Sequence, residues 1–442
     1  MSTETEHIFE RLRSGTVPEK GLDKFAVGID KPIAEIRRQL DLAKSGEGCF
    51  KFLRGGYGCG KTFMSQYTLL EAMNANFAVS FVVVSPNDTQ FHKFDDVYHK
   101  IVSNLRTSMA ESGTLEFMID RWISRIEDRL AEEIGDDADD FDERVKLRFE
   151  SELDELTKES TGNEFIAVLK AYFDAKQAGE YSTASGLVAW LSGSKNIASA
   201  IKSKAGIKGE ISSASAMTFL KGIVSIVKRA GYSALVVVID ELETILRTRT
   251  DVRQKSLNGL RQIIDAAKDF RGMVWVFTGT PEFFDSRKGV AGLEPLHDRI
   301  KFATSGGFTS PKQPQLELKP FDKDRLRQVA LRLREIFPSK DKERVYRLVD
   351  DFFIDSLTAM VTSGLRGDVG VIPRQFLREL VTVLDLVEEF DGSDGGDAYI
   401  PKDRYNFPAT TLSEDDERLR SGVQEAVDSD EAAGYQVEQL EW

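Results

Sequence analysis

A glycine-rich turn followed at once by a lysine and a threonine is the stretch of this sequence whose residue types and spacing point most directly to chemistry. The turn fits the pattern G-x-x-x-x-G-K-[ST] completely, with the residues Gly55, Gly56, Tyr57, Gly58, Cys59, Gly60, Lys61 and Thr62. Successive glycines let backbone N–H groups curl around an anion, which suits the phosphates of a nucleoside triphosphate. We expect Lys61 to contact the β- and γ-phosphates and the Thr62 hydroxyl to occupy one position on Mg²⁺.

The elements on either side of this turn are those that the motif requires. A short apolar strand is predicted over Cys49–Leu53, and an amphipathic helix begins at Lys61. A tight turn with a chance lysine is the alternative, and the strand–loop–helix context argues against it. The sequence therefore predicts that Gly55 through Phe63 bind a nucleoside triphosphate, with Cys59 as a small residue tolerated in the loop rather than a redox switch.

A pair of acids near the middle of the chain is the second candidate for chemistry. The continuous apolar run Leu235–Ile239 is typical of a central strand covered on both faces, and Asp240 and Glu241 follow it directly. Asp240 is placed to hold Mg²⁺, directly or through water. Glu241 can polarise the water that attacks the γ-phosphate.

Further candidate site residues follow other predicted elements. A strand over Met273–Phe277 ends in Thr278 and Thr280, which are either sensors of the γ-phosphate or ordinary strand-end residues. If this strand lies between the strand that leads into the glycine-rich turn and the strand that ends at Asp240, it places a hydroxyl beside the phosphate loop. Ahead of the loop, Val27 and Gly28 either lie against the adenine ring or simply precede a helix that packs on the sheet.

Two arginines complete the set of candidates. Arg299 ends a short predicted helix, where it either reaches the nucleotide of a neighbouring subunit or forms a surface ion pair. Arg374 begins a helix, where its charge opposes the helix dipole, and this hints at a reason for it other than helix stability.

Strands that alternate with helices predict an α/β fold with a parallel sheet, to which a fifth strand over Gln315–Leu318 belongs. Residues from about 108 to 215 form a long insertion between the second and third strands. Its first half is helical and acidic, either a solvated face or a docking surface. Its second half, rich in Lys, Gly and Ser, either touches a phosphate backbone or is a flexible exposed loop.

These patterns predict four parts of the chain. They are a flexible N-terminal arm over residues 1–20, a nucleotide-binding base domain over 21–321, a helical domain over 322–390 and an acidic tail over 391–442.

Composition narrows the classes of protein that remain. A formal net charge of −14 argues against a surface that coats nucleic acid everywhere and leaves room only for local DNA backbone contact. Two cysteines exclude a disulfide framework and indicate a reducing compartment, and the four histidines do not cluster with cysteines at zinc-ligand spacing. With no signal pattern and no apolar run approaching a membrane span, the expected location is cytoplasmic.

Taken together, the residues resemble those of AAA+ P-loop ATPases of the class with an additional catalytic glutamate. The PLHDRI context of Arg299 is similar to an arginine-finger box, and Ile372-Pro373-Arg374 is similar to the start of a second-sensor helix. The stretch PRQFLREL resembles the lid of origin-recognition-type initiators. More narrowly, KFLRGGYGCGKTF, GYSALVVVIDELETI and FTGTPEFFDS resemble the ATP-binding protein of BREX bacteriophage-defence systems, the BrxD-like family, over roughly residues 20 to 390.

The resemblance implies a five-stranded parallel sheet flanked by helices, a C-terminal helical lid, ATP and Mg²⁺ as ligands, and an oligomer that works with helicase-like or other DNA-processing defence proteins. It also implies that Arg374 closes the lid over the subunit's own nucleotide and that Arg299 acts across a subunit boundary. Asp391 to Trp442 is too short and too acidic for the winged-helix DNA reader of initiators. A nucleotide-dependent interaction scaffold with slow hydrolysis is the alternative function, and a small-molecule kinase is a weaker one.

Overall fold

Residues 3–85, 89–158, 162–364, 372–393 and 395–405 are described by a computed structural model. They divide into two compact units. One spans Val17–Pro320, and the other combines the residues up to Thr16 with those from Phe321 onward. We call them the sheet unit and the helical unit and describe each by itself.

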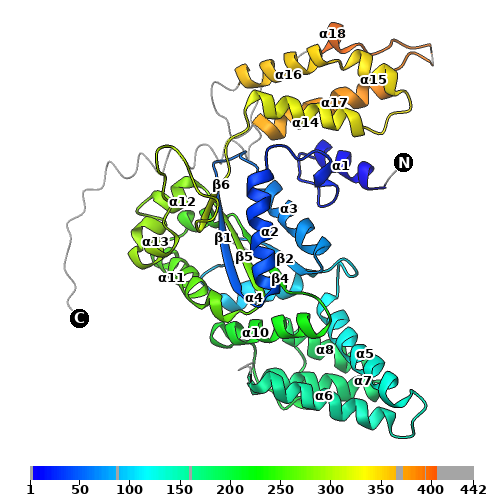
Figure 1. The fold of residues 1–442 in the computed structure, drawn as a ribbon, viewed down its shortest axis with the longest axis vertical. Helices are drawn as coiled ribbons and strands as arrows, with labels where there is room; N and C mark the ends of the chain where they lie inside the picture. The colour runs from blue at the N-terminus through cyan, green and yellow to red at the C-terminus, as the bar shows by residue number, and fades with distance from the viewer. Residues whose placement is uncertain (1–2, 86–88, 159–161, 365–371, 394, 406–442) are drawn as a thin grey trace, which may run out of the picture. The chain divides into compact units, whose positions relative to one another are not determined.

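A single, mostly parallel sheet organises the sheet unit (Figure 1). Its strands are β1 (Gly48–Arg54), β2 (Ala78–Val83), β3 (Leu105–Arg106), β4 (Leu235–Asp240), β5 (Met273–Gly279) and β6 (Gln315–Glu317). The strand order is β3-β2-β4-β5-β1-β6, and only β3 runs antiparallel to its neighbour. The sheet therefore has six strands rather than the five predicted: five are parallel, and the antiparallel β3 was missed because two residues leave no periodic pattern in the sequence.

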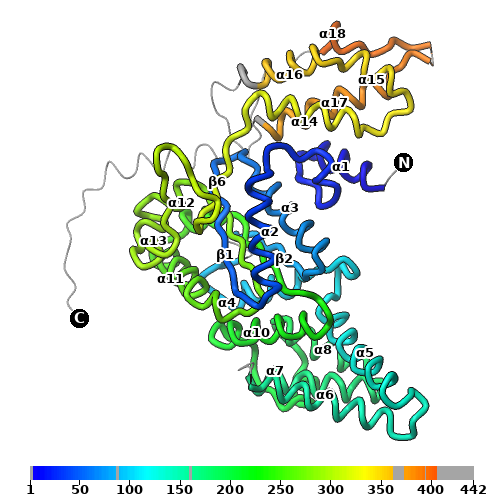
Figure 2. Tube along the Cα trace, viewed as in Figure 1, coloured from blue at the N-terminus to red at the C-terminus, as the bar shows by residue number. Residues whose placement is uncertain are grey.

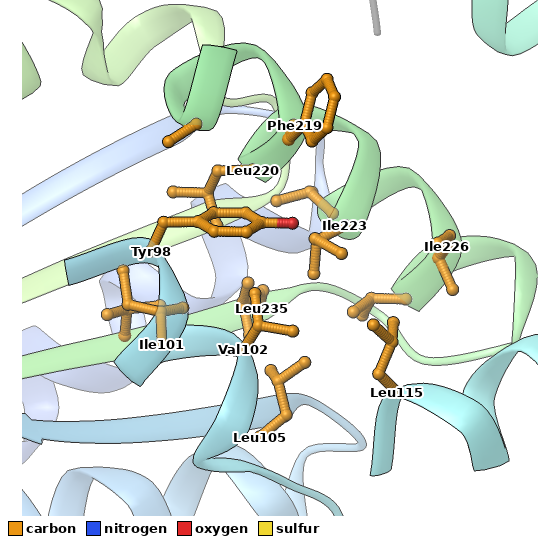
Figure 3. Packing of buried hydrophobic residues seen from close by; sticks show 14 of the residues in the cluster. Tyr98, Ile101, Val102, Leu105, Leu115, Phe219, Leu220, Ile223, Ile226 and Leu235 are labelled. Atoms are coloured by element: carbon orange, nitrogen blue, oxygen red, sulfur yellow. The ribbon is translucent and has the colours of Figure 1, made fainter. Parts of the chain in front are cut away.

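Helices cover both faces of this sheet, which is why β4 and β5 are buried along their whole length. Helices that contact the sheet directly include α2 (Asp30–Lys44), α3 (Lys61–Asn74) and α4 (Phe94–Ser103), and α10 (Ser213–Arg229) packs on α4. Figure 3 shows Tyr98 and Val102 of α4 in one apolar cluster with Leu220 and Ile223 of α10 and Leu235 of β4. Apolar side chains at helical spacing on α4 and α10 thus meet alternate residues of the strands.

The segment between β2 and β4 contains five further helices. They are α5 (Thr114–Ile134), α6 (Phe141–Lys158), α7 (Asn163–Gln177), α8 (Tyr181–Leu191) and α9 (Ser199–Lys204). Trp122 packs on Phe149, and Phe149 stacks on Phe173, so aromatic contacts join α5, α6 and α7, and these side chains continue the hydrophobic core of the sheet. The second half is more ordered than a flexible loop, because it contains α9 and buries Ile207 and Ile211.

The remaining helical segments of the sheet unit are one long helix, α11, and several short ones. These are η1 (Leu22–Lys24), η2 (Leu242–Arg247), α11 (Thr250–Ala266), η3 (Ala267–Asp269), α12 (Pro281–Asp285), η4 (Val290–Gly292) and α13 (Glu294–Ile300). Of these, η2 follows the paired acids directly and α12 follows Thr280. Both segments therefore begin at the carboxyl edge of the sheet.

The helical unit consists of α1 (Thr3–Arg13), α14 (Lys323–Ile336), α15 (Lys342–Leu348), α16 (Asp351–Gly364), α17 (Ile372–Glu389) and α18 (Pro401–Arg404). The N-terminal residues were predicted as a flexible arm, and this is wrong for α1, whose Ile8, Phe9 and Leu12 are buried. The Arg13 guanidinium donates two hydrogen bonds of 2.8 Å to Asp385 of α17. None of the helices in the described ranges is long and apolar enough to cross a membrane. Residues 406–442, most of the predicted tail, lie outside them.

Candidate nucleotide-binding site

The glycine-rich turn joins the carboxyl end of β1 to the first residue of α3. Gly58 and Gly60 have φ values of 69° and 83°, a left-handed conformation that side chains rarely adopt. At Gly55, a Cβ atom would lie 3.0 Å from the Cβ of Cys59 and 3.2 Å from the carbonyl oxygen of Leu318. The backbone conformation thus favours glycine at Gly58 and Gly60, and a side chain at Gly55 would crowd its neighbours.

Lys61 folds back over this turn. Its side chain is 9% exposed, and Nζ donates to the carbonyl oxygens of Gly55 and Gly56 at 3.0 and 3.2 Å. Nζ also lies 3.4 Å from a carboxylate oxygen of Glu243 and 5.1 Å from the centre of the Tyr57 ring. The ammonium group is therefore held inside the concave side of the loop.

Asp240, the last residue of β4, contacts the residue that follows the lysine of the glycine-rich turn. It is 2% exposed, and one of its carboxylate oxygens accepts a hydrogen bond of 3.2 Å from the Thr62 hydroxyl. Carboxylate and hydroxyl oxygens are ligands that suit Mg²⁺, which usually completes its shell with phosphate oxygens and water. No group of three or more His, Cys, Asp or Glu side chains that could hold a metal occurs in the described ranges. Thr62 and Asp240 thus fit Mg²⁺ only as part of a shell that a phosphate and water complete.

Thr278, at the end of β5, links Asp240 to Glu241. It is fully buried, its hydroxyl donates to the second carboxylate oxygen of Asp240, and it accepts a hydrogen bond of 3.0 Å from the Glu241 N–H. The condition stated for this residue is met, because β5 pairs with both β1 and β4. Thr280 differs, since its hydroxyl caps α12 by accepting from the Phe283 N–H at 3.4 Å.

Glu241 has an unusual backbone conformation and an exposed side chain. Its φ of 63° is left-handed, which turns the chain sharply after β4. The Glu241 N–H also donates to Asp240 at 3.1 Å. Partial desolvation, followed by the negative charges of Asp240 and Glu243, raises the pKa of the Glu241 carboxyl. A carboxylate with a raised pKa is a stronger base and is suited to accept a proton from water.

Glu243 and Arg247 are site residues that the sequence analysis missed. Both lie on η2. Glu243 is buried beside Lys61, and one of its carboxylate oxygens has no hydrogen-bond partner among the described residues. Desolvation, followed by the charge of Glu243, raises the pKa of the Tyr57 hydroxyl, and the charge of Arg247 and its hydrogen bond oppose this. An acid three residues after Asp240, within the turn, is the signal that could have indicated Glu243.

The segment ahead of the phosphate loop lies near the start of α3. The Phe25 ring packs edge-on against the Phe63 ring, with 5.5 Å between their centres. Val27 is buried and Gly28 has a left-handed φ of 69°. Their contact with a base remains a prediction. Cys59 is buried, and this burial raises the pKa of its thiol.

The two candidate arginines lie on other helices of the chain. Arg299 of α13 forms an ion pair with Asp265 of α11 and donates to the carbonyl of Pro295, which is the arrangement named as the alternative to a role in a neighbouring subunit. Arg374 is the third residue of α17, in the helical unit, and is exposed. The roles expected for both remain predictions.

Comparison with known proteins assigns the family. A search of curated proteins finds no match. Among solved structures, the ORC2 protein of Aeropyrum pernix, in ADPNP–ADP complexes, is similar at 14% identity and a TM-score of 0.34, over 91% of this chain and 68% of that one. The family model described as BREX system ATP-binding protein BrxC/D matches residues 1–402. The chain therefore belongs to the BrxC/D family of BREX system ATP-binding proteins.

Proposed function

We propose that this chain binds ATP with Mg²⁺ at the carboxyl edge of its sheet and hydrolyses it, as an AAA+ switch or motor subunit of a BREX-type bacteriophage-defence system. The observation that carries the proposal is the hydrogen bond between Thr62 and Asp240, at 3.2 Å. It joins the phosphate loop to the paired acids across 178 residues of sequence. These are the two parts that Mg²⁺-dependent phosphoryl transfer needs at one place.

Each side chain has a separate task in this proposal. Backbone N–H groups of the glycine-rich turn bind the phosphates, and Lys61 adds a positive charge to them. Thr62 and Asp240 hold Mg²⁺, which neutralises charge that develops on the phosphate oxygens. Glu241 orients water and accepts its proton.

Thr278 acts on the other members through its hydrogen bonds. It fixes the carboxylate of Asp240 and the backbone of Glu241, so a change at either acid is transmitted to the other through one hydroxyl group. Thr280 is assigned no contact with the phosphates, because its hydroxyl caps α12. In this proposal Arg299 exchanges Asp265 for the nucleotide of a neighbouring subunit, which makes hydrolysis depend on an oligomer. Arg374 acts from the helical unit on the subunit's own nucleotide.

The test uses Glu241→Gln, which keeps the size of the side chain and removes its basicity. We expect the variant to bind ATP as tightly as the wild type and to release phosphate at least 100-fold more slowly, which is the usual contribution of a general base. Lys61→Ala should lose ATP binding. Glu282→Gln, at an exposed acid of α12, is the matched control. Unchanged turnover in Glu241→Gln would contradict the assigned role.

A nucleotide-dependent scaffold is the second candidate, and the segment between β2 and β4 is what favours it. Helices α5, α6 and α7 are joined by aromatic contacts, and the four aspartates of the turn between α5 and α6 are all exposed. The variant Glu241→Gln separates the two, with biological function as the readout and with mass photometry, with and without ATP and duplex DNA, as the measure of assembly. A motor loses biological function in this variant while still assembling with ATP, whereas a scaffold keeps its function.

A further inference from the structure

The segment between α13 and β6, residues 301–314, forms a loop with a defined tip. Ser305 and Phe308 exchange two backbone hydrogen bonds of 3.0 Å, so they close an antiparallel bridge around Gly306 and Gly307. These glycines have φ values of 56° and 80°, as in a type I′ hairpin turn, which requires positive φ at both central residues. The pair of glycines thus sets the conformation of the tip. We call residues 301–314 the Phe308 loop.

Phe308 is displayed at this tip. It is 83% exposed, more than any other large apolar residue that the structure describes. A single exposed phenylalanine is common on protein surfaces and carries no conclusion by itself. The way in which the loop is fastened and charged is what makes this one informative.

A buried lysine fastens the base of the Phe308 loop. Lys51 of β1 is 2% exposed, and its ammonium group donates to the carbonyl oxygens of Pro311, Lys312 and Gln313 at 3.1, 3.0 and 2.6 Å. Glu35 of α2 supplies the counter-charge at 2.8 Å. Burying an ion pair costs several kcal/mol of desolvation free energy. A connecting loop does not ordinarily need a buried charge to fix its position.

The two arms of the loop are also joined to each other. The side-chain oxygen of Gln313 accepts a hydrogen bond of 2.9 Å from the Ala303 N–H. Arg54 lies 4.8 Å from the centre of the Phe302 ring and forms an ion pair with Asp285. The base of the loop is thus fixed on both arms, while the tip extends into solvent.

The charge of this region differs from that of the rest of the chain. The protein has a net charge of −14, yet no aspartate or glutamate occurs between Asp298 and Glu317. Lys301 and Lys312 are exposed on opposite arms of the loop. Between them lie four hydroxyl side chains, namely Thr304, Ser305, Thr309 and Ser310. The loop therefore combines one aromatic ring with cations and hydrogen-bond donors and lacks negative charge.

We propose that the Phe308 loop binds single-stranded nucleic acid, with Phe308 stacked on an unpaired base and with Lys301 and Lys312 at the backbone phosphates. Stacking on a ring together with neutralisation of phosphates is the usual basis of such binding. A protein partner would need a contiguous apolar surface, and Phe308 is the only strongly exposed large apolar side chain among the loop residues. A fully paired duplex offers no free base for stacking. The inference is independent of the nucleotide site.

Fluorescence anisotropy of the full chain with a labelled oligothymidylate is the first test. Phe308→Ala should weaken binding about tenfold or more, because base stacking is worth about 1–3 kcal/mol and each 1.4 kcal/mol is a factor of ten. Phe352→Ala is the matched control, since Phe352 is 72% exposed but stands beside Asp350 and Asp351. It should bind as the wild type does.

The lysines are tested through the salt dependence. Loss of two phosphate contacts in Lys301→Glu combined with Lys312→Glu should reduce the slope of log K against log salt by about 1.4, since each contact to single strands contributes about 0.7. Lys61→Ala, measured without nucleotide, should keep the affinity of the wild type for the oligonucleotide. A failure of the proposed ATPase function is thereby separated from a failure of this inference.

Phe308→Trp reports the contact directly. Stacking on a base should quench the added fluorescence, whereas the native Trp122, Trp190 and Trp275 are buried and should change little. Equal affinity of Phe308→Ala and the wild type, absence of quenching, or no binding by the wild type at low salt would each overturn the inference. So would a Phe308→Ala variant that keeps its affinity for the oligonucleotide but loses self-association in mass photometry.

Discussion

Replacing Glu243 by glutamine should tighten ATP binding about tenfold. In the structure, Lys61 is shared between the carbonyl groups of its own loop and the Glu243 carboxylate at 3.4 Å. A phosphate that binds Lys61 has to compete with this carboxylate. Removing the competing charge therefore favours the nucleotide-bound state over the free one.

The magnitude follows from the distance and the burial of the pair. At 3.4 Å and an effective dielectric constant of about 20, the gross attraction between the two charges is about 5 kcal/mol. Desolvation offsets most of it, because the side chains are only 9% and 8% exposed. A net value of about 1–2 kcal/mol remains, and 1.4 kcal/mol corresponds to a factor of ten in the dissociation constant.

The assay is calorimetric titration of ATP into wild type and Glu243→Gln at fixed Mg²⁺ concentration. Glu282→Gln, which removes an acid of the same unit that makes no ion pair with Lys61, controls for the change in net charge. Glu243→Gln should also unfold at a lower temperature than the wild type without ATP, because Lys61 loses its counter-charge, and this difference should shrink as ATP is added. Weaker or unchanged ATP binding in Glu243→Gln would refute the competition.

Three further predictions concern Thr278, Glu241 and Lys51. Thr278→Val should lower the free energy of unfolding by about 1–3 kcal/mol, the cost of an unpaired buried group, and should weaken Mg²⁺-dependent ATP binding; equal Mg²⁺ dependence in variant and wild type would contradict this. Folding raises the pKa of the Glu241 carboxyl, so its negative charge destabilises the folded protein at pH values above the ordinary pKa of about 4.5 and has no such effect well below it. At pH 8, Glu241→Gln should therefore unfold at a higher temperature than the wild type. This difference in unfolding temperature should shrink as the pH falls toward 4. Lys51→Met should destabilise the sheet unit by about 3–5 kcal/mol in urea unfolding, and a second change, Glu35→Gln, should recover part of this loss.

The sequence was sufficient for the parts of the site that are local in the chain. The strand, turn and helix around Gly55 to Thr62 could be predicted because the motif fixes their spacing, while phosphate binding by this turn stays a prediction. Strands β2, β4 and β5 could be predicted because they are apolar along most of their length. The contact of Glu243 with Lys61 could not be predicted, because it depends on a left-handed backbone conformation at Glu241 that a glutamate rarely adopts. The helix α1 was mistaken for a loose arm because one of its partners, Asp385, lies 372 residues away.

The arginines and threonines show where pattern alone stops being decisive. Thr278 and Thr280 are two residues apart, and both were plausible sensors of the γ-phosphate. Residues two apart share a face of an extended strand, but β5 ends at Gly279. Thr278 donates to Asp240, whereas Thr280 caps α12 and accepts from a backbone N–H. Arg299 was given two interpretations, and the ion pair with Asp265 is the arrangement named in one of them, while a role in a neighbouring subunit stays a prediction. A choice between two roles for one residue requires knowing which side chains the fold brings next to it, and the sequence pattern alone does not give this.

Strand β1 connects the two surfaces inferred here. Its carboxyl end leads into the phosphate loop, and Lys51, three residues before Arg54, holds the carbonyl groups at the base of the Phe308 loop. A change at Lys51 should therefore disturb both nucleotide affinity and binding of the oligonucleotide, whereas Phe308→Ala should alter only the second. If Lys51→Met were to release the Phe308 loop while leaving ATP affinity unchanged, β1 would hold the two surfaces independently. A joint loss would instead mean that the buried pair positions both, which gives a physical reason for placing a charged pair inside this sheet unit.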